Sequence, residues 1–112
     1  MIASVKFPEI YLCDFPFTSG TSSKKRPCLV LLDLGADVLI ARVTSIPHAE
    51  PCDLPIRDWQ QAGLLKASTV RLSRLVTIER DLLLKQLGTL TSFDRDLIIT
   101  LWQTKMQLGR DL

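Results

Sequence analysis

Apolar residues recur with two different periods along the chain. Up to residue 90, apolar and polar positions alternate or apolar residues form short runs, which is typical of β-strands. From Thr91 onward, apolar side chains recur every three or four residues, which is typical of an amphipathic helix. This order predicts a mainly β (α+β) fold: a small, strongly bent antiparallel sheet or partial barrel with short connecting helices and one C-terminal helix across a side.

Short strands are expected at residues 9–17, 28–32, 38–44, 54–56, 68–78 and 87–90. The run 28–32 is apolar at every position, as expected of a central strand covered on both faces. It is followed by a turn at residues 34–37, so it and the next strand are predicted to form a hairpin. In the strand 68–78 the alternation leaves Arg71 on the polar face, and Arg74 interrupts the apolar face. We expect a bend or bulge near Arg74.

The segments between strands carry turn and helix signals. Asp58 and Gly63 are placed as the N-cap and the left-handed terminator of a helix of one to two turns. A further helical turn is expected at residues 81–85, and the segment 45–53 holds two prolines and is read as an exposed loop. Capping residues at positions 91 and 92 begin a C-terminal helix of about four turns.

Length and charge narrow the function classes. A chain of 112 residues is expected to form one domain, 1–112, and its 46% apolar content argues against disorder. Lys and Arg number 14 against 12 acidic residues, which leaves a net charge of +2. This charge is too small to indicate a nucleic-acid binder by bulk electrostatics. Any anionic partner must therefore be held by a local cluster of cations.

Cysteine usage and hydropathy predict a cytoplasmic protein. Cys13, Cys28 and Cys52 are odd in number and lack Cys-x-x-Cys spacing, so we expect three reduced thiols and no zinc site. The N-terminus has no apolar stretch of signal-peptide length, and the longest apolar runs fall far short of the roughly 20 residues that span a bilayer. Neither export nor a membrane partner is expected.

Candidate chemistry concentrates at a basic loop end and a hydroxyl pair. The single histidine, His48, excludes a two-histidine acid–base pair, and no metal or cofactor motif is present. A loop of Gly, Ser and Thr ends in three cations, of which Arg26 is followed by Pro27, and Thr44-Ser45 closes a later strand. A guanidinium and a hydroxyl are suited to binding a phosphodiester. Taken alone, the same residues are more often a solvated loop cation and an ordinary strand end.

Several segments together resemble the MazF/PemK-type toxins of bacterial toxin–antitoxin systems. These are IYLCDFPF at 10–17, the Gly/Ser loop, KRPCLVLL at 25–32, RVTS at 42–45, DLPI at 53–56, VRL at 70–72 and LGTL at 87–90. The resemblance implies a compact SH3-like barrel that works as a homodimer. It also implies metal-independent cleavage of single-stranded RNA, mRNA in particular, and silencing by a cognate antitoxin.

The resemblance also assigns roles to individual residues. Arg26 and Thr44 match the family's catalytic pair, for attack of a ribose 2′-hydroxyl on the adjacent phosphorus. Because arginine stays protonated, Arg26 is expected to clamp the phosphate and stabilise its charge, and Thr44 to hydrogen-bond a phosphate oxygen; the general base is left open. The expected RNA-binding residues are Lys24, Lys25, Ser45, His48 and Arg71. The expected flap over the RNA is Thr18, Ser19, Gly20, Thr21, Ser22 and Ser23.

Two departures from the family pattern keep an alternative open. This chain has Pro8-Glu9 where the family begins its first strand with Gly and an acid, and Ile46 where many relatives place a polar residue. The alternative is a catalytically inactive SH3-like module that binds RNA or an antitoxin-type peptide. An antitoxin is expected at the basic surface of Lys24, Lys25 and Arg26, with Arg42 and Arg71 as weaker members. For the dimer, the helix face of Leu97, Leu101 and Trp102 is the candidate, unless it is used as intramolecular core.

Overall fold

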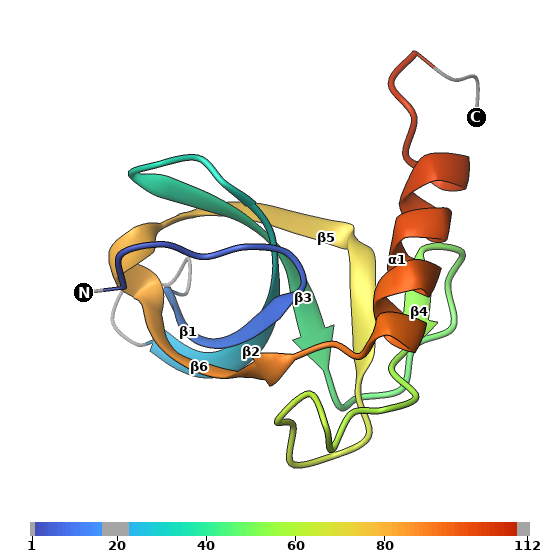
Figure 1. Ribbon diagram of the computed structural model, residues 1–112, viewed down its shortest axis with the longest axis horizontal. Coiled ribbons are helices and arrows are strands. Elements are labelled where there is room, and N and C mark those ends of the chain that lie inside the picture. The colour runs from blue at the N-terminus through green and yellow to red at the C-terminus, as the bar shows by residue number, and fades with distance from the viewer. Residues whose placement is uncertain (1, 17–22, 110–112) are drawn as a thin grey trace.

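The computed structural model describes residues 2–16 and 23–109 (Figure 1). Within these residues, six strands form one antiparallel sheet in the spatial order β4-β5-β3-β2-β1-β6. The strands are β1 (Glu9–Pro16), β2 (Ser23–Asp33), β3 (Asp37–Thr44), β4 (Asp53–Pro55), β5 (Thr69–Glu79) and β6 (Leu83–Thr89). A 3-10 turn, η1 (Arg80–Leu82), joins β5 to β6, and the helix α1 (Ser92–Lys105) follows. The mainly β prediction with a C-terminal helix is confirmed.

The sheet bends into an open barrel. Figure 1 shows β1, β2 and β6 curling together on one side of the molecule while β5 arches across to the other side, where α1 stands beside β4. The two edge strands, β4 and β6, do not pair with each other, so the barrel is partial, as predicted. The β2–β3 hairpin is also present, with its turn closed by a hydrogen bond from Leu34 N to Asp37 O of 2.9 Å.

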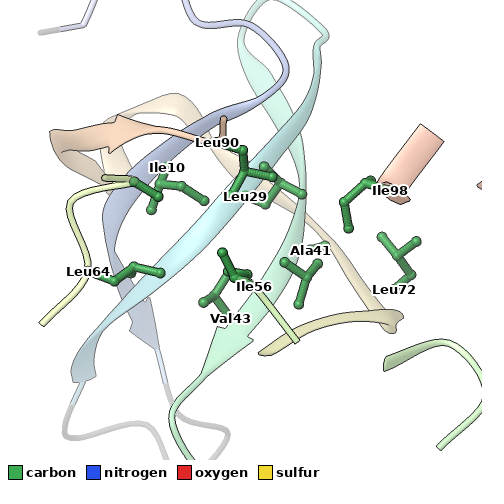
Figure 2. Packing of buried hydrophobic residues seen from close by; sticks show 11 residues of the cluster. Ile10, Leu29, Ala41, Val43, Ile56, Leu64, Leu72, Leu90 and Ile98 are labelled. Atoms are coloured by element: carbon green, nitrogen blue, oxygen red, sulfur yellow. The ribbon is translucent and has the colours of Figure 1, made fainter. Parts of the chain in front are cut away.

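Alternate residues of the central strands pack into two hydrophobic cores, one on each face of the sheet. The helix-side core includes Ile10, Leu29 and Ala41 and receives Ile98 from α1 (Figure 2). The barrel core, on the other face of the sheet, consists of Val5, Tyr11, Cys13, Cys28, Val30, Val38, Ile40, Ile78 and Leu83. Because neighbouring residues such as Leu29 and Val30 enter different cores, β2 is covered on both faces, as the apolar run predicted.

The break predicted in the fifth strand is present. Ala41 on β3 pairs with Leu75, but the next residue, Arg42, pairs with Arg71, so β5 has extra residues in between. The prediction of a polar outer face for the first half of β5 is wrong, because Thr69 and Arg71 are each 8% exposed. This half pairs with both β3 and β4, and Asp53 of β4 binds Arg71.

The predicted connecting helices are corrected in part. Residues 57–63 form consecutive turns and not a helix, with Gly63 at φ +86° ending them. They pack directly on β6: a Cβ added to Gly63 would collide with the carbonyl of Leu87, and one added to Gly88 with the carbonyl of Ala62. The helical turn expected at 81–85 is only η1, since Leu83 already begins β6.

The expectation of three reduced thiols is wrong for two of them. Cys13 on β1 and Cys28 on β2 form a disulfide, with their Cα atoms 6.4 Å apart. Cys52 is the free cysteine in the described part of the chain. The bond joins neighbouring strands, so it depended on the register of β1 and β2, which cysteine spacing does not reveal. Across residues 2–16 and 23–109, no helix is both long and apolar enough to cross a membrane.

Candidate functional site

A cavity of about 760 Å³ gathers most of the predicted site residues. It lies at the edge of the sheet where β2 and β5 begin and β3 ends. Of the predicted residues, those that line it are Lys25, Arg26, Thr44, Ser45, His48 and Arg71. The structure therefore brings together residues that are up to 46 positions apart in the sequence, from Lys25 to Arg71.

The register of the sheet indicates why Arg26 and Thr44 line the same cavity. Cys28 on β2 pairs with Arg42 on β3, and the two strands are antiparallel. The paired register of these two strands ends at Cys28 and Arg42, and its continuation by two residues leads from Arg26 toward Thr44. Residues two apart on a strand share a face, so Arg26, Arg42 and Thr44 project from the same face of the sheet. Arg26 is exposed and Thr44 half-buried.

Thr44 is oriented by its own backbone. The N–H of Ile46 donates a hydrogen bond of 3.1 Å to Thr44 Oγ1. With its oxygen used as an acceptor, the hydroxyl hydrogen remains available for donation to a ligand. Ile46 itself is 63% exposed and lines the cavity, so the departure from a polar residue falls within the site. The other departure, Pro8-Glu9, does not line it.

Arg71 differs from the exposed cation that the strand pattern predicted. Its Nε donates a hydrogen bond of 2.9 Å to Asp53 Oδ1, and its Nη2 lies 3.4 Å from Glu50 Oε1. The side chains of Arg71 and Asp53 are 9% and 1% exposed, whereas that of Glu50 is 64% exposed. Arg71 is therefore a fixed element of the cavity wall, with its charge balanced by a buried carboxylate.

The carboxylate of Asp53 stays ionised beside this guanidinium. Burial, the largest effect, raises the pKa of Asp53, but the hydrogen bond from Arg71, the hydrogen bond from the Glu50 N–H and the charge of Arg71 together outweigh it. The net pKa lies below the ordinary value. The Glu50 N–H is 2.9 Å from Asp53 Oδ2, so the same carboxylate also anchors the loop that carries His48.

The remaining predicted residues lie around or beyond the cavity. His48 is half-buried and Ser45 exposed, and Lys24 is exposed but does not line the cavity. Ser23, predicted as part of the flap, is the first residue of β2, so the strand begins five residues earlier than expected. The other predicted flap residues lie outside the described residues: Thr18, Ser19, Gly20, Thr21 and Ser22.

The cavity is also lined by four cations that were not predicted to bind RNA: Arg42, Lys66, Arg74 and Lys85. The described residues that line it include seven Lys or Arg side chains and no Asp or Glu. Arg42 had a sequence signal, since it precedes Thr44 by two residues on one strand. The other three come from separate elements and are placed here by tertiary structure. A protein of net charge +2 thus concentrates positive charge at one cavity.

A family model for PemK-like, MazF-like toxins of type II toxin–antitoxin systems matches residues 6–100. The chain belongs to this family. The resemblance found in the sequence is thereby confirmed, and the matched range includes β1–β6, all residues lining the cavity and most of α1. A comparison with curated proteins gave no significant match.

Solved structures of MazF-type proteins share the fold of this PemK/MazF chain. An endoribonuclease from a mycobacterial species is 22% identical, with a TM-score of 0.73 over 99% of this chain and 98% of that one. A mycobacterial endoribonuclease in complex with its cognate antitoxin is 20% identical, with a TM-score of 0.72 over 96% and 100%. A MazE–MazF structure from Deinococcus radiodurans is 17% identical, with a TM-score of 0.67 over 99% and 100%. At these identities the likeness establishes a common fold.

Proposed function

We propose that this PemK/MazF-family toxin is a metal-independent endoribonuclease that cleaves single-stranded RNA, mRNA in particular, and thereby inhibits translation and growth. The observation that carries the proposal is that Arg26 and Thr44 line the same cavity, together with six further Lys or Arg side chains. Two of the similar structures are endoribonucleases, which supports the same activity for this chain.

The proposed reaction uses a nucleophile supplied by the substrate. The ribose 2′-hydroxyl attacks the adjacent phosphorus; the O2′–P bond forms, the P–O5′ bond breaks, and the products are a cyclic phosphate and a free 5′-hydroxyl. The 2′-hydroxyl loses its proton to a base that we do not assign, and the departing 5′-oxygen gains one. Arg26 holds two phosphate oxygens as charge develops on them, and Thr44, whose oxygen is fixed by Ile46 N–H, donates a hydrogen bond to one.

The other predicted residues have supporting roles in this proposal. Lys25, Ser45 and His48 contact the RNA along the cavity, and Lys24 raises the local concentration of the polyanion. Arg71 contributes positive charge from a fixed position. The segment from Thr18 to Ser22, which precedes β2, is proposed as the flap over the bound RNA.

The proposed partners are a cognate antitoxin and a second copy of the chain, in the cytoplasm, where mRNA is translated. The similar structures that contain an antitoxin support the first partner. A groove of about 320 Å³ between α1 and the sheet, lined by Phe7, Leu31, Leu32, Leu39, Ile98, Ile99, Trp102 and Gln103, is the candidate dimer face. Of the helix residues predicted for the dimer contact, Leu101 and Trp102 pack on the helix-side core of the same chain. Leu97 is 39% exposed and remains accessible to a second copy.

Cleavage of defined single-stranded RNAs in the presence of a chelator tests the proposal. Arg26→Ala is expected to lower the rate by at least about a hundredfold, because one positioned donor to transition-state charge contributes 10²–10³-fold. Thr44→Val is expected to lower the rate in the same direction, and Lys24→Ala, a matched loss of an exposed cation outside the cavity, by only a few-fold.

Circular dichroism must show that all variants are folded. If wild type and Arg26→Ala cut equally, or if neither cuts, the endoribonuclease proposal is wrong and the inactive binding module is favoured. Growth arrest on expression, relieved by co-expression of an antitoxin, would support the toxin role in cells.

A further inference from the structure

We infer that Arg42, backed by the ring of Phe15, binds a nucleobase beside the scissile phosphate and so determines part of the cleavage preference. The inference rests on the proposed function, since it places the phosphate at Arg26 and Thr44. It assigns Arg42 a role in recognising the RNA sequence, separate from the proposed cleavage roles of Arg26 and Thr44. The sequence had suggested Arg42 only as a weak member of a surface for an acidic partner.

Arg42 lies within one nucleotide of the proposed reaction centre. It precedes Thr44 by two residues on β3, which is roughly 7 Å along a strand. Both side chains leave the same face of the sheet, and Arg42 lines the same cavity as Arg26 and Thr44. A strand of RNA whose phosphate is held by the catalytic pair therefore passes over or beside Arg42.

The charge of Arg42 is not neutralised by an ion pair among the described residues. Its direct partner on β5 is Arg71, another cation, which is already held by Asp53 and Glu50. Like charges on directly opposed residues of a sheet are unfavourable, so the strand pairing gives no reason for an arginine at position 42.

The guanidinium of Arg42 is nevertheless held in place. Its Cζ lies 5.5 Å from the centroid of the Phe15 ring, within the range of a cation–π contact. Phe15 in turn packs against the barrel core, so the ring is itself supported. The side chain of Arg42 is exposed, which leaves the side of the guanidinium away from Phe15 and its N–H edge open to the cavity.

This arrangement fits a base better than a phosphate. A planar guanidinium supported by an aromatic ring offers a face to an unstacked base or paired donors to a base edge, and both modes are common in recognition of single-stranded RNA. A phosphate needs charge and hydrogen bonds but no aromatic support. Lys25, Lys66 and Lys85 already supply such charge along the same cavity.

Cleavage of a randomised single-stranded RNA pool, read by sequencing the cut ends, tests the inference. The proteins compared are wild type, Arg42→Ala, Arg42→Lys, Phe15→Leu and Lys24→Ala. For Arg42→Ala, the preference at one nucleotide flanking the cut is expected to weaken by about tenfold or more. Arg42→Lys keeps the charge but loses the plane, so it is expected to behave like Arg42→Ala. Phe15→Leu should weaken the same preference, and Lys24→Ala should slow all RNAs alike.

The controls separate the possible failures. If Arg42→Ala slows every RNA by the same factor and Arg42→Lys restores the rate, Arg42 is a phosphate contact and the inference is overturned. An unchanged sequence profile in both variants overturns it as well. Binding of RNAs that differ at that nucleotide, measured with Arg26→Ala and Arg26→Ala/Arg42→Ala proteins, gives a readout without cleavage. Base-dependent affinity that disappears in the double variant supports the inference even if the protein does not cut RNA; affinity that is the same in both proteins overturns it.

Discussion

At the scale of single residues, Arg71 shows how burial changes the meaning of a charge. On a strand of alternating pattern it was expected to be a solvated cation available to RNA. In the structure it is 8% exposed and hydrogen-bonded to Asp53, whose side chain is 1% exposed. Such a pair contributes little if both members are exchanged for apolar residues, but removing one member leaves an uncompensated buried charge.

Asp53→Asn should therefore destabilise the protein strongly. We expect the free energy of unfolding at pH 7, measured by urea denaturation, to fall by about 3–5 kcal/mol, because Arg71 keeps its charge without a buried partner. Glu50→Gln is the matched control: Glu50 contacts the same guanidinium but is 64% exposed, so its loss should cost less than about 1 kcal/mol. Equal effects of the two substitutions would contradict the burial argument.

At the scale of elements, the segment 58–63 was predicted as a short helix, and residues 57–63 form a series of turns. The hydrogen bonds from Ala62 N to Asp58 O (3.1 Å) and from Leu64 N to Trp59 O (3.0 Å) have different ring sizes, so no regular helix is propagated. The segment is held by its neighbours: the carboxylate of Asp94, 1% exposed in the first turn of α1, accepts hydrogen bonds of 2.9 Å from the N–H groups of Arg57 and Asp58. The contact between Asp94 and these two N–H groups joins residues more than 30 positions apart, so it became visible only in the fold.

Gly63→Ala tests the close packing of these turns on β6. Alanine at φ +86° is strained, and its Cβ would collide with the carbonyl of Leu87. We expect a loss of about 2–4 kcal/mol in the free energy of unfolding and slower RNA cleavage, since Gly63 and Leu87 both line the cavity.

Gly35→Ala provides the comparison for that substitution. Gly35 has φ +94° but open space around its Cβ position, so only the backbone strain of about 1–2 kcal/mol applies. If the two variants were equally stable in thermal or urea unfolding, the collision with β6 would not be important.

At the scale of the whole molecule, three carboxylates connect distant segments: Asp33, Asp53 and Asp58. Each has a pKa below its ordinary value. For Asp33 the main cause is the hydrogen bond from the Gly35 N–H, with further lowering by the Val5 N–H and Arg80. For Asp58 it is the hydrogen bond from Arg57, followed by that from Thr91. For Asp53, the contacts with Arg71 and Glu50 outweigh burial, which acts in the opposite direction. These contacts tie the N-terminal segment, the β4 region and the start of α1 to the sheet.

Stability should consequently fall on acidification. A carboxyl whose pKa is lower in the folded than in the unfolded state binds more protons when unfolded, so its contribution is present above the unfolded value of about 3.9 and is lost as the pH falls through the folded value. We expect the free energy of unfolding to decrease below about pH 4, and to decrease less steeply in Asp53→Asn. Urea titrations between pH 6 and 2.5 measure both slopes; parallel curves would show that Asp53 does not contribute.

Local patterns were sufficient for the order of strands before a helix, the central strand, the bulge in β5, the C-terminal helix and the family, because each is encoded by residues close in sequence. They also identified Arg26 and Thr44 as a candidate pair. The Cys13–Cys28 bond, the buried partner of Arg71 and the place of Arg42 at the cavity could not be obtained in this way. These depend on which residues face one another across strands, and that register is determined by the packing of the whole sheet.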